Sequence, residues 1–278
     1  MNTQIKLFVL TAFILATFTS CYEGVVIEGN NEPAEEIRQL PDFNEVTSSG
    51  SFNIYYTQGD STGVKIEAES NLIPYIETAV FDGRLDIRFA SHVNVQINQV
   101  IDIYVTNPSV NKIQLSGSGK IVADSVSVNS LELDVSGSGN IQSHFYGKNF
   151  QSSISGSGLM NIIADCDTVE ANISGSGRIN LEAYKCSLSE ITISGSGKAE
   201  LTGSSDKAIF SIIGSGKISA YDFPVKKADI TISGSGDIYV KVSEILDAIL
   251  SGSGDLHYMG TPLINFNTSG SGKLIPEN

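Results

Sequence analysis

Residues 169–198 read VEANISGSGRINLEAYKCSLSEITISGSGK and contain the tetrapeptide Ser-Gly-Ser-Gly twice. The tetrapeptide recurs through the C-terminal part of the chain, with starts at Ser116, Ser136, Ser155, Ser174, Ser194, Ser233, Ser251 and Ser269, and a variant, Ile213-Gly214-Ser215-Gly216, lies in the one gap. Successive starts are 18 to 20 residues apart. Because a unit this short cannot bury its own apolar face, the nine copies must stack on one another.

Apolar residues alternate with other residues on both sides of the motif. Val169, Ala171 and Ile173 precede one copy, and Ile179 and Leu181 follow it. A period of two indicates β-strands with one face directed inward. We therefore predict an all-β protein, a parallel β-helix or solenoid of about nine turns of 18–20 residues each. We expect the right-handed coil that parallel crossovers adopt.

The two glycines of each motif share the inward parity of the apolar residues, whereas the serines point outward. Two explanations are open for the glycines: a corner with no room for a Cβ atom, or a positive φ that bends the chain. We expect the serine hydroxyls of stacked corners to hydrogen-bond from turn to turn. The structural glycines are Gly117, Gly119, Gly137, Gly139, Gly156, Gly158, Gly175, Gly177, Gly195, Gly197, Gly214, Gly216, Gly234, Gly236, Gly252, Gly254, Gly270 and Gly272.

The segment ahead of the repeats lacks the motif but contains four alternating stretches, at residues 52–56, 64–68, 85–89 and 101–105. These stretches predict β-strands that cap the first turn, because an uncovered solenoid end is an open sheet edge. A separate small sheet and irregular first turns would both serve as this cap. The predicted divisions are a signal segment (1–20), an acidic linker (21–40), an N-terminal β cap (41–112) and the repeats (113–278).

The N-terminus carries an export signal. Lys6 precedes an apolar run over residues 7–18, which at about a dozen residues is too short to span a bilayer and is typical of a secretory signal peptide. Small residues before Cys21 resemble the cleavage box of bacterial lipoproteins, in which the cysteine becomes the acylated first residue. We therefore expect an exported protein, held through lipid on Cys21 at the outer membrane or the cell surface.

These features together resemble the head-GIN-domain family of auto-transporter adhesins. The resemblance rests on the lipoprotein-like start, the Phe52-Asn53-Ile54-Tyr55 strand after Ser49-Gly50, the turn Asp82-Gly83-Arg84-Leu85 and the serial Ser-Gly-Ser-Gly motifs. It covers roughly residues 43–275. It implies a secreted or surface-tethered β-helical protein, and it brings no catalytic residue with it.

The composition and the motifs argue against several classes of function. With 31 acidic and 17 basic residues and a net charge of −14, the chain lacks the basic surface that nucleic acids require. The Gly-Ser-Gly-Lys runs lack the upstream glycine and the downstream Ser or Thr of a phosphate-binding loop. The histidines, His92, His144 and His257, lie far apart in sequence and in repeat position. We therefore expect no enzyme and no cofactor.

Two pairs of residues share a repeat position in neighbouring turns. Asp237 and Asp255 each follow a motif; a solvated charge ladder is the simpler interpretation, and a weak cation bridge is the alternative. Cys166 and Cys186 each lie eight residues before the next motif, which places their Cα atoms about 4.8 Å apart. That spacing permits a disulfide, but side-by-side Cβ vectors favour free, stacked thiols.

The function expected from these observations is a non-catalytic lipoprotein of the cell envelope that presents a β-helical surface, as an adhesin would, to a protein or a glycan. The alternative is a polysaccharide-binding or polysaccharide-active β-helix protein. We expect no aromatic stripe of the kind that stacks on sugar rings. The reason is that we place the tyrosines of the repeats at differing positions relative to their motifs: Tyr146, Tyr184, Tyr221, Tyr239 and Tyr258.

Overall fold

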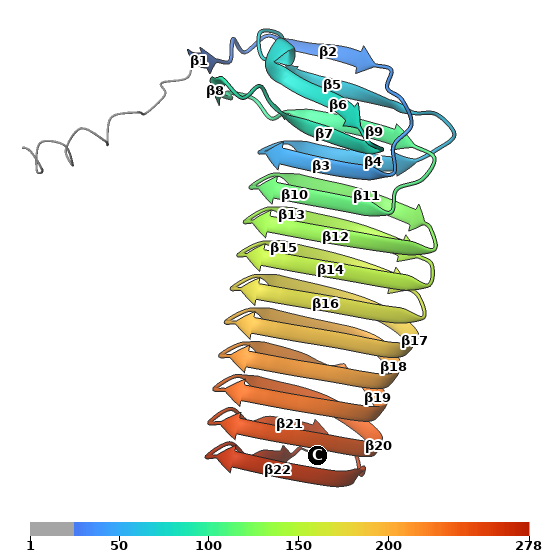
Figure 1. The fold of residues 1–278 in the computed structure, drawn as a ribbon, viewed down its shortest axis with the longest axis vertical. Coiled ribbons are helices and arrows are strands. Elements are labelled where there is room, and N and C mark those ends of the chain that lie inside the picture. The colour runs from blue at the N-terminus through green and yellow to red at the C-terminus, as the bar shows by residue number, and fades with distance from the viewer. Residues whose placement is uncertain (1–24, 278) are drawn as a thin grey trace, which may run out of the picture.

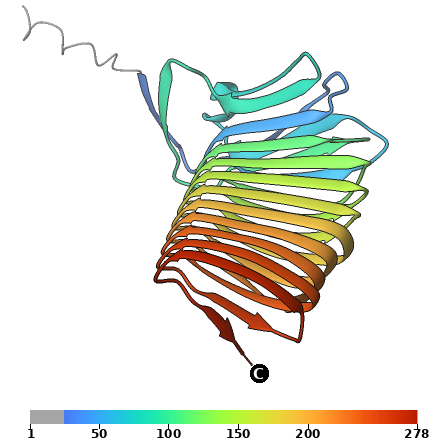
Figure 2. The same cartoon turned by 60° about the horizontal axis from the view of Figure 1, so that its bottom comes forward.

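Residues 25–277 are described by a computed structural model of the chain. They form a parallel β-solenoid of about nine turns, as predicted, and no α-helix occurs within this range (Figure 1). In the earlier turns two strands meet at the Ser-Gly-Ser-Gly corner, and in four later turns one long strand runs from one corner to the next. The solenoid therefore has two layers with the core between them (Figure 2).

The strands of the motif-containing turns are β10 (Lys112–Gly117), β11 (Lys120–Ser127), β12 (Ser130–Gly137), β13 (Asn140–Tyr146), β14 (Asn149–Gly156), β15 (Leu159–Asp165), β16 (Thr168–Gly175), β17 (Arg178–Gly195), β18 (Lys198–Gly214), β19 (Lys217–Gly234), β20 (Asp237–Gly252), β21 (Leu256–Met259), β22 (Leu263–Gly270) and β23 (Leu274–Pro276). The N-terminal elements are β1 (Val25–Glu28), β2 (Pro33–Arg38), β3 (Glu45–Gly50), β4 (Asn53–Gln58), β5 (Gly63–Glu69), the 3-10 turn η1 (Ile73–Tyr75), β6 (Ile76–Phe81), β7 (Arg84–Phe89), β8 (Val93–Gln96) and β9 (Asp102–Asn107).

Neighbouring turns pair in register, so equivalent residues stack in columns parallel to the solenoid axis. Between β16 and β17, Ile173 pairs with Ile193 and Gly175 pairs with Gly195. Both isoleucines are at most 2% exposed, and the other inward positions of these strands are buried in the same way. The alternating pattern in the sequence therefore becomes a continuous apolar core along the axis.

The two glycines of a corner have different roles, so each of the two explanations applies to one of them. The first glycine has a positive φ, 121° at Gly195, and a Cβ atom there would lie 2.5 Å from the carbonyl oxygen of Gly175. That oxygen accepts a hydrogen bond of 2.8 Å from the N–H of Ser196. The second glycine lies on the core, where a Cβ atom at Gly197 would lie 2.5 Å from Cγ2 of Ile173.

The predicted ladder of serine hydroxyls is wrong for most turns. Among residues 25–277, motif hydroxyls bond only from Ser269 to Ser251, at 3.3 Å, and from Ser271 to Ser253, at 3.1 Å. The corners are held by the backbone bonds described above, and the motif serines are exposed, so water competes for their hydroxyls.

Replacing Gly195 by alanine is expected to destabilise the fold by about 2–4 kcal/mol, because the new Cβ atom combines backbone strain with overpacking against the turn below. Replacing the exposed Ser196 by alanine is expected to cost about 0.5 kcal/mol or less. Urea unfolding of the two variants and the wild type measures both values. Equal losses for the two variants would contradict the assigned role of the first glycine.

A further solenoid turn precedes the first full motif. β3 and β4 pair in parallel with β10 and β11, and Gly50 stands in register with Gly117. Phe52, which is fully buried, takes the place of the second glycine of the motif. β7 pairs with β3 and β9 pairs with β4, in each case on the side away from the repeats. The cap therefore consists of irregular first turns in the same sheet, one of the two arrangements that the sequence left open.

The segment expected to be a linker, residues 21–40, contains two strands, so that prediction is wrong for residues 25–38. β1 pairs with β8 in parallel, and β2 pairs antiparallel with β5. β2 shows little apolar alternation, and its Ile37 is 66% exposed. It is held by backbone pairing and by Arg38, whose Nη1 donates to Ile76 O at 2.6 Å and to Thr78 Oγ1 at 3.0 Å.

A buried carboxylate joins the N-terminal segment to the cap. Glu69, at the end of β5, is fully buried and accepts backbone N–H bonds from Asn31 at 2.7 Å, Asn98 at 3.0 Å and Gln99 at 3.3 Å. Burial alone would raise the pKa of Glu69, but the three donors outweigh it and hold the pKa below its ordinary value. The charged form is therefore the one that the cap stabilises.

This arrangement predicts a pH dependence. Because the pKa of Glu69 is lower in the folded state, its stabilising effect should be complete above the pKa of an unfolded Glu, about 4.3, and should disappear as the pH falls through the folded value. Glu69→Gln should lower the urea midpoint at pH 7, and the gap from wild type should close in acid. Glu35→Gln, at an exposed position of β2, is the control. A gap that stays constant with pH would contradict this role.

Candidate functional site

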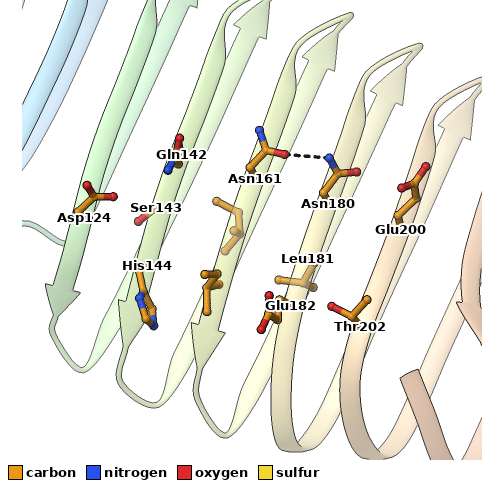
Figure 3. A pocket seen from close by; sticks show the side chains of 12 residues that line it. Asp124, Gln142, Ser143, His144, Asn161, Asn180, Leu181, Glu182, Glu200 and Thr202 are labelled. Atoms are coloured by element: carbon orange, nitrogen blue, oxygen red, sulfur yellow. Dashed lines mark hydrogen bonds between the residues drawn. The ribbon is translucent and has the colours of Figure 1, made fainter. Parts of the chain in front are cut away.

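A shallow trough crosses the strands that follow the motif corners. Its volume is about 370 Å³, and it extends over five turns, from Asp124 in β11 to Thr202 in β18 (Figure 3). At about 4.8 Å per turn, the trough is about 19 Å long along the solenoid axis.

Two rows of outward side chains border the trough. The row nearer the corners is Gln142, Asn161, Asn180 and Glu200, and the second row is His144, Ile163, Glu182 and Thr202. Figure 3 labels all of these residues except Ile163. The rows are two residues apart along each strand, which is why both point outward. Ile162 and Leu181 lie between the rows and are 2% exposed, so the floor of the trough is apolar.

Several polar groups of the trough have no partner in the described part of the chain. Asn180 Nδ2 donates to Asn161 Oδ1 at 2.8 Å, the bond drawn in Figure 3. Within residues 25–277, no atom accepts from Asn161 Nδ2, and the side chains of Gln142 and Thr202 make no hydrogen bond. These groups are therefore available to a molecule that lies in the trough.

Two of the three carboxylates that line the trough have partners, and the third, Asp124, has no hydrogen bond or ion pair within residues 25–277. Glu182 accepts a hydrogen bond from the hydroxyl of Tyr184, and this bond raises the pKa of that tyrosine. Glu200 lies 3.8 Å from Arg178, measured between Oε1 and Nη1. Such an arrangement can orient a ligand through hydrogen bonds.

The histidines do not come together. His92 is exposed ahead of β8, His144 lies in the trough, and His257 lies in β21. Among the described residues, no three His, Cys, Asp or Glu side chains gather in a way that could hold a metal ion.

Two tyrosines form a short column beside the trough, and the expectation of no shared aromatic position is wrong for this pair. Tyr146 pairs with Asp165, and Tyr184 lies one residue beyond Ala183, which pairs with Ala164. The two tyrosines therefore occupy the same column two turns apart. Counting from the preceding motif reveals this, because each lies ten residues after the first serine of that motif.

Both tyrosines contact the second row of the trough. Tyr146 stacks on His144 with ring centroids 4.2 Å apart, and its hydroxyl lies 3.3 Å from His144 Nδ1. Tyr184 bonds to Glu182 in the equivalent way. Because Tyr146 is 39% exposed and Tyr184 is 49% exposed, each ring keeps a surface free for contact.

A second aromatic cluster lies in the last turns, and its rings contact one another. Tyr239 stacks on His257 at 4.5 Å and meets the edge of Tyr221 at 5.6 Å. His257 Nδ1 lies 2.9 Å from Glu277, which fixes the end of the described chain. Burial raises the pKa of Tyr221 to about 12. This cluster stabilises the last turns and offers less free ring surface than the tyrosine pair.

The two aspartates considered for a cation bridge have a structural role. Asp237 Oδ1 accepts the N–H of Asp255 at 3.0 Å, and Asp255 Oδ1 accepts the N–H of Lys273 at 2.8 Å. In earlier turns a glycine carbonyl accepts the equivalent N–H, as Gly197 O does for Lys217. The carboxylates therefore replace backbone acceptors where the repeat shortens to 18 residues.

Cys166 and Cys186 are both buried and both free thiols. Thr168 pairs with Leu188, so the cysteines two residues earlier stand in the same column. The neighbouring Cys186 thiol, burial, and the charges of Asp165 and Asp167 together raise the pKa of Cys166. The Cys166 thiol lowers the pKa of Cys186, against the effect of burial.

We predict that these thiols stay reduced after export. In the Cys21→Ser protein, denaturation without reductant should expose two thiols that react with a chromogenic disulfide reagent. The folded protein should react slowly, because both side chains are at most 6% exposed. If the denatured protein shows no reactive thiol, the two cysteines form a disulfide and the prediction is wrong.

Comparison with known families assigns the chain. The profile of the family described as "Putative auto-transporter adhesin, head GIN domain" matches residues 42–206 and 190–262. The chain belongs to this head-GIN-domain family. The match includes the cap, all five turns of the trough and most of the later turns. Comparison with curated proteins gave no match.

Solved structures share the fold. A protein from Parabacteroides distasonis described as a "putative lipid binding protein" is 29% identical, with a TM-score of 0.69 over 91% of this chain and 100% of that chain. A "putative adhesin" from the same species is 22% identical, and one from Parabacteroides merdae is 19% identical. Both have a TM-score of 0.67 over 91% of this chain and 100% of theirs. The two adhesin structures support the solenoid fold alone.

Proposed function

We propose that this head-GIN-domain protein is a non-catalytic adhesin of the cell envelope, tethered through lipid on Cys21, with the solenoid wall as its interaction surface. The observation that carries the proposal is the trough, a long groove on a parallel sheet in which the side chains of Gln142 and Thr202 and the Nδ2 of Asn161 have no partner within residues 25–277. Two of its three carboxylates, Glu182 and Glu200, have side-chain partners. Family membership indicates a cell-surface protein.

The proposed tether sets the orientation of the molecule. Cys21 and the signal segment 1–20 lie outside the described residues, and β1 begins four residues after Cys21. Four extended residues reach about 14 Å at most, so an anchor on Cys21 would hold the capped end near the membrane. The turns that follow would then project away from it (Figure 1). Within residues 25–277, no helix is long and apolar enough to cross a membrane.

Replacing Cys21 by serine is expected to abolish metabolic labelling with a palmitate analogue and to move the protein from the membrane fraction to the soluble fraction, because stable anchoring needs the acyl chains. Mass spectrometry of the wild-type N-terminus measures the modification directly. An unmodified N-terminus, together with a serine variant that stays on the membrane, would remove the lipoprotein from the proposal.

The second candidate is a polysaccharide-binding or polysaccharide-active protein. The polar trough with its exposed tyrosine pair favours the binding form of this alternative. The lipid binding named in the description of the 29% identical structure has less support in this chain, because the solenoid interior is filled by buried side chains.

A further inference from the structure

We propose that the trough and the tyrosine pair beside it bind an extended, uncharged polysaccharide that runs along the solenoid axis. This inference rests on the proposed function and names the chemical class of the adhesin's partner. The binding site comprises the free polar groups of Gln142, Asn161 and Thr202 and the rings of Tyr146 and Tyr184.

The shape of the site fits a linear polymer. The trough is open to solvent, crosses five turns and presents a polar side chain at each turn, at intervals of about 4.8 Å. A compact ligand would contact only one or two of these turns. An extended chain can place hydroxyl groups against several turns at once, and many weak contacts of this kind add together.

The chemistry of the site fits sugar rings. Tyr146 and Tyr184 are about 10 Å apart along the axis, as residues two turns apart must be. Exposed phenol rings offer rigid contact area to the apolar faces of sugars. The Asn161 Nδ2 donor and the Gln142 amide can bond sugar hydroxyls. The exposed Ile163 adds apolar contact area in the turn between those of the two tyrosines. The polar row and the two tyrosine rings therefore lie next to each other on one face of the solenoid.

The same features disfavour an extended peptide. A peptide binds a sheet through the free main-chain groups of an edge strand. β13, β15 and β17 cross the trough, and each pairs with a strand on both sides, so none offers a free edge. A ligand of this trough must bind through side chains, as a polysaccharide does.

The charge of the site disfavours acidic polymers. Asp124, Glu182 and Glu200 border the trough, and Arg178 is the cation paired with Glu200. The whole chain has a net charge of −14. Three cations of this wall stand in the next column towards the corner and do not line the trough: Lys120, Arg178 and Lys198. The lining itself therefore favours an uncharged polymer over a uronate or sulfated one.

Affinity electrophoresis of the purified full-length protein tests the proposal. The native gels contain dextran, galactomannan or xyloglucan as neutral probes, or polygalacturonate as the acidic probe. We expect at least one neutral polymer to retard the protein and polygalacturonate to leave its mobility unchanged. Tyr146→Ala combined with Tyr184→Ala should weaken the retardation constant at least tenfold, and Gln142→Ala should weaken it several-fold.

Phe81→Ala is the matched control, because Phe81 is 75% exposed in β6, which extends the layer of strands that precede the corners, whereas the trough lies on the strands that follow them. It should bind as the wild type does, and equal urea midpoints should show that all variants are folded. The proposal is overturned if no neutral polymer retards the wild type, if the double variant binds as tightly as the control, or if polygalacturonate binds as well as the neutral polymers. Membrane labelling at Cys21 separates the two proposals, since a labelled protein that binds no neutral polymer contradicts only this one.

Discussion

The backbone hydrogen bond between stacked corners is the interaction on which the rest of the structure depends. In turn after turn, the N–H of a motif serine donates at 2.8 Å to the carbonyl oxygen of the first glycine below it, as Ser176 does to Gly156 and Ser215 to Gly195. A Cβ atom at Gly175 would lie 2.6 Å from the first of these oxygens, and a Cβ atom at Gly214 would lie 2.5 Å from the second. The hydrogen bond can therefore form only where the second residue of the motif above has no Cβ atom, which is why that residue is glycine. The motif recurs because every turn must repeat this contact.

Register follows from the corner, and surface chemistry follows from register. Once the corners coincide, inward residues such as Ile173 and Ile193 stack into the core and outward residues stack into columns. The amide row of the trough and the tyrosine pair beside it are two such columns on one wall. A recognition surface can thus change by single outward substitutions without disturbing the corner, which suits an adhesin that must keep its fold while its partner varies.

The sequence predicted the repeating part of the fold because period and parity are local signals. It did not predict β2, which has little apolar alternation and is held by pairing with β5 and by the bonds of Arg38. It did not predict the nest around Glu69, because residues 31, 69 and 98 meet only after the cap has folded. The shared column of Tyr146 and Tyr184 can be predicted by counting from the motif that precedes each tyrosine. Counting back from the motif that follows does not reveal it, because the segments after the two tyrosines differ in length.

Native-state hydrogen exchange at the corners measures most directly whether this stacking holds the fold together. In isolation, Ser-Gly-Ser-Gly has the composition of a flexible linker, whose amides would exchange within seconds. In the stack, we predict that the amides of Ser176, Ser196 and Ser215 exchange only through global unfolding, as slowly as the core amides of Ile173 and Ile193. Fast exchange at the corner amides, with the core strands still protected, would show that the corners are loops and would contradict the central role of the glycine contact.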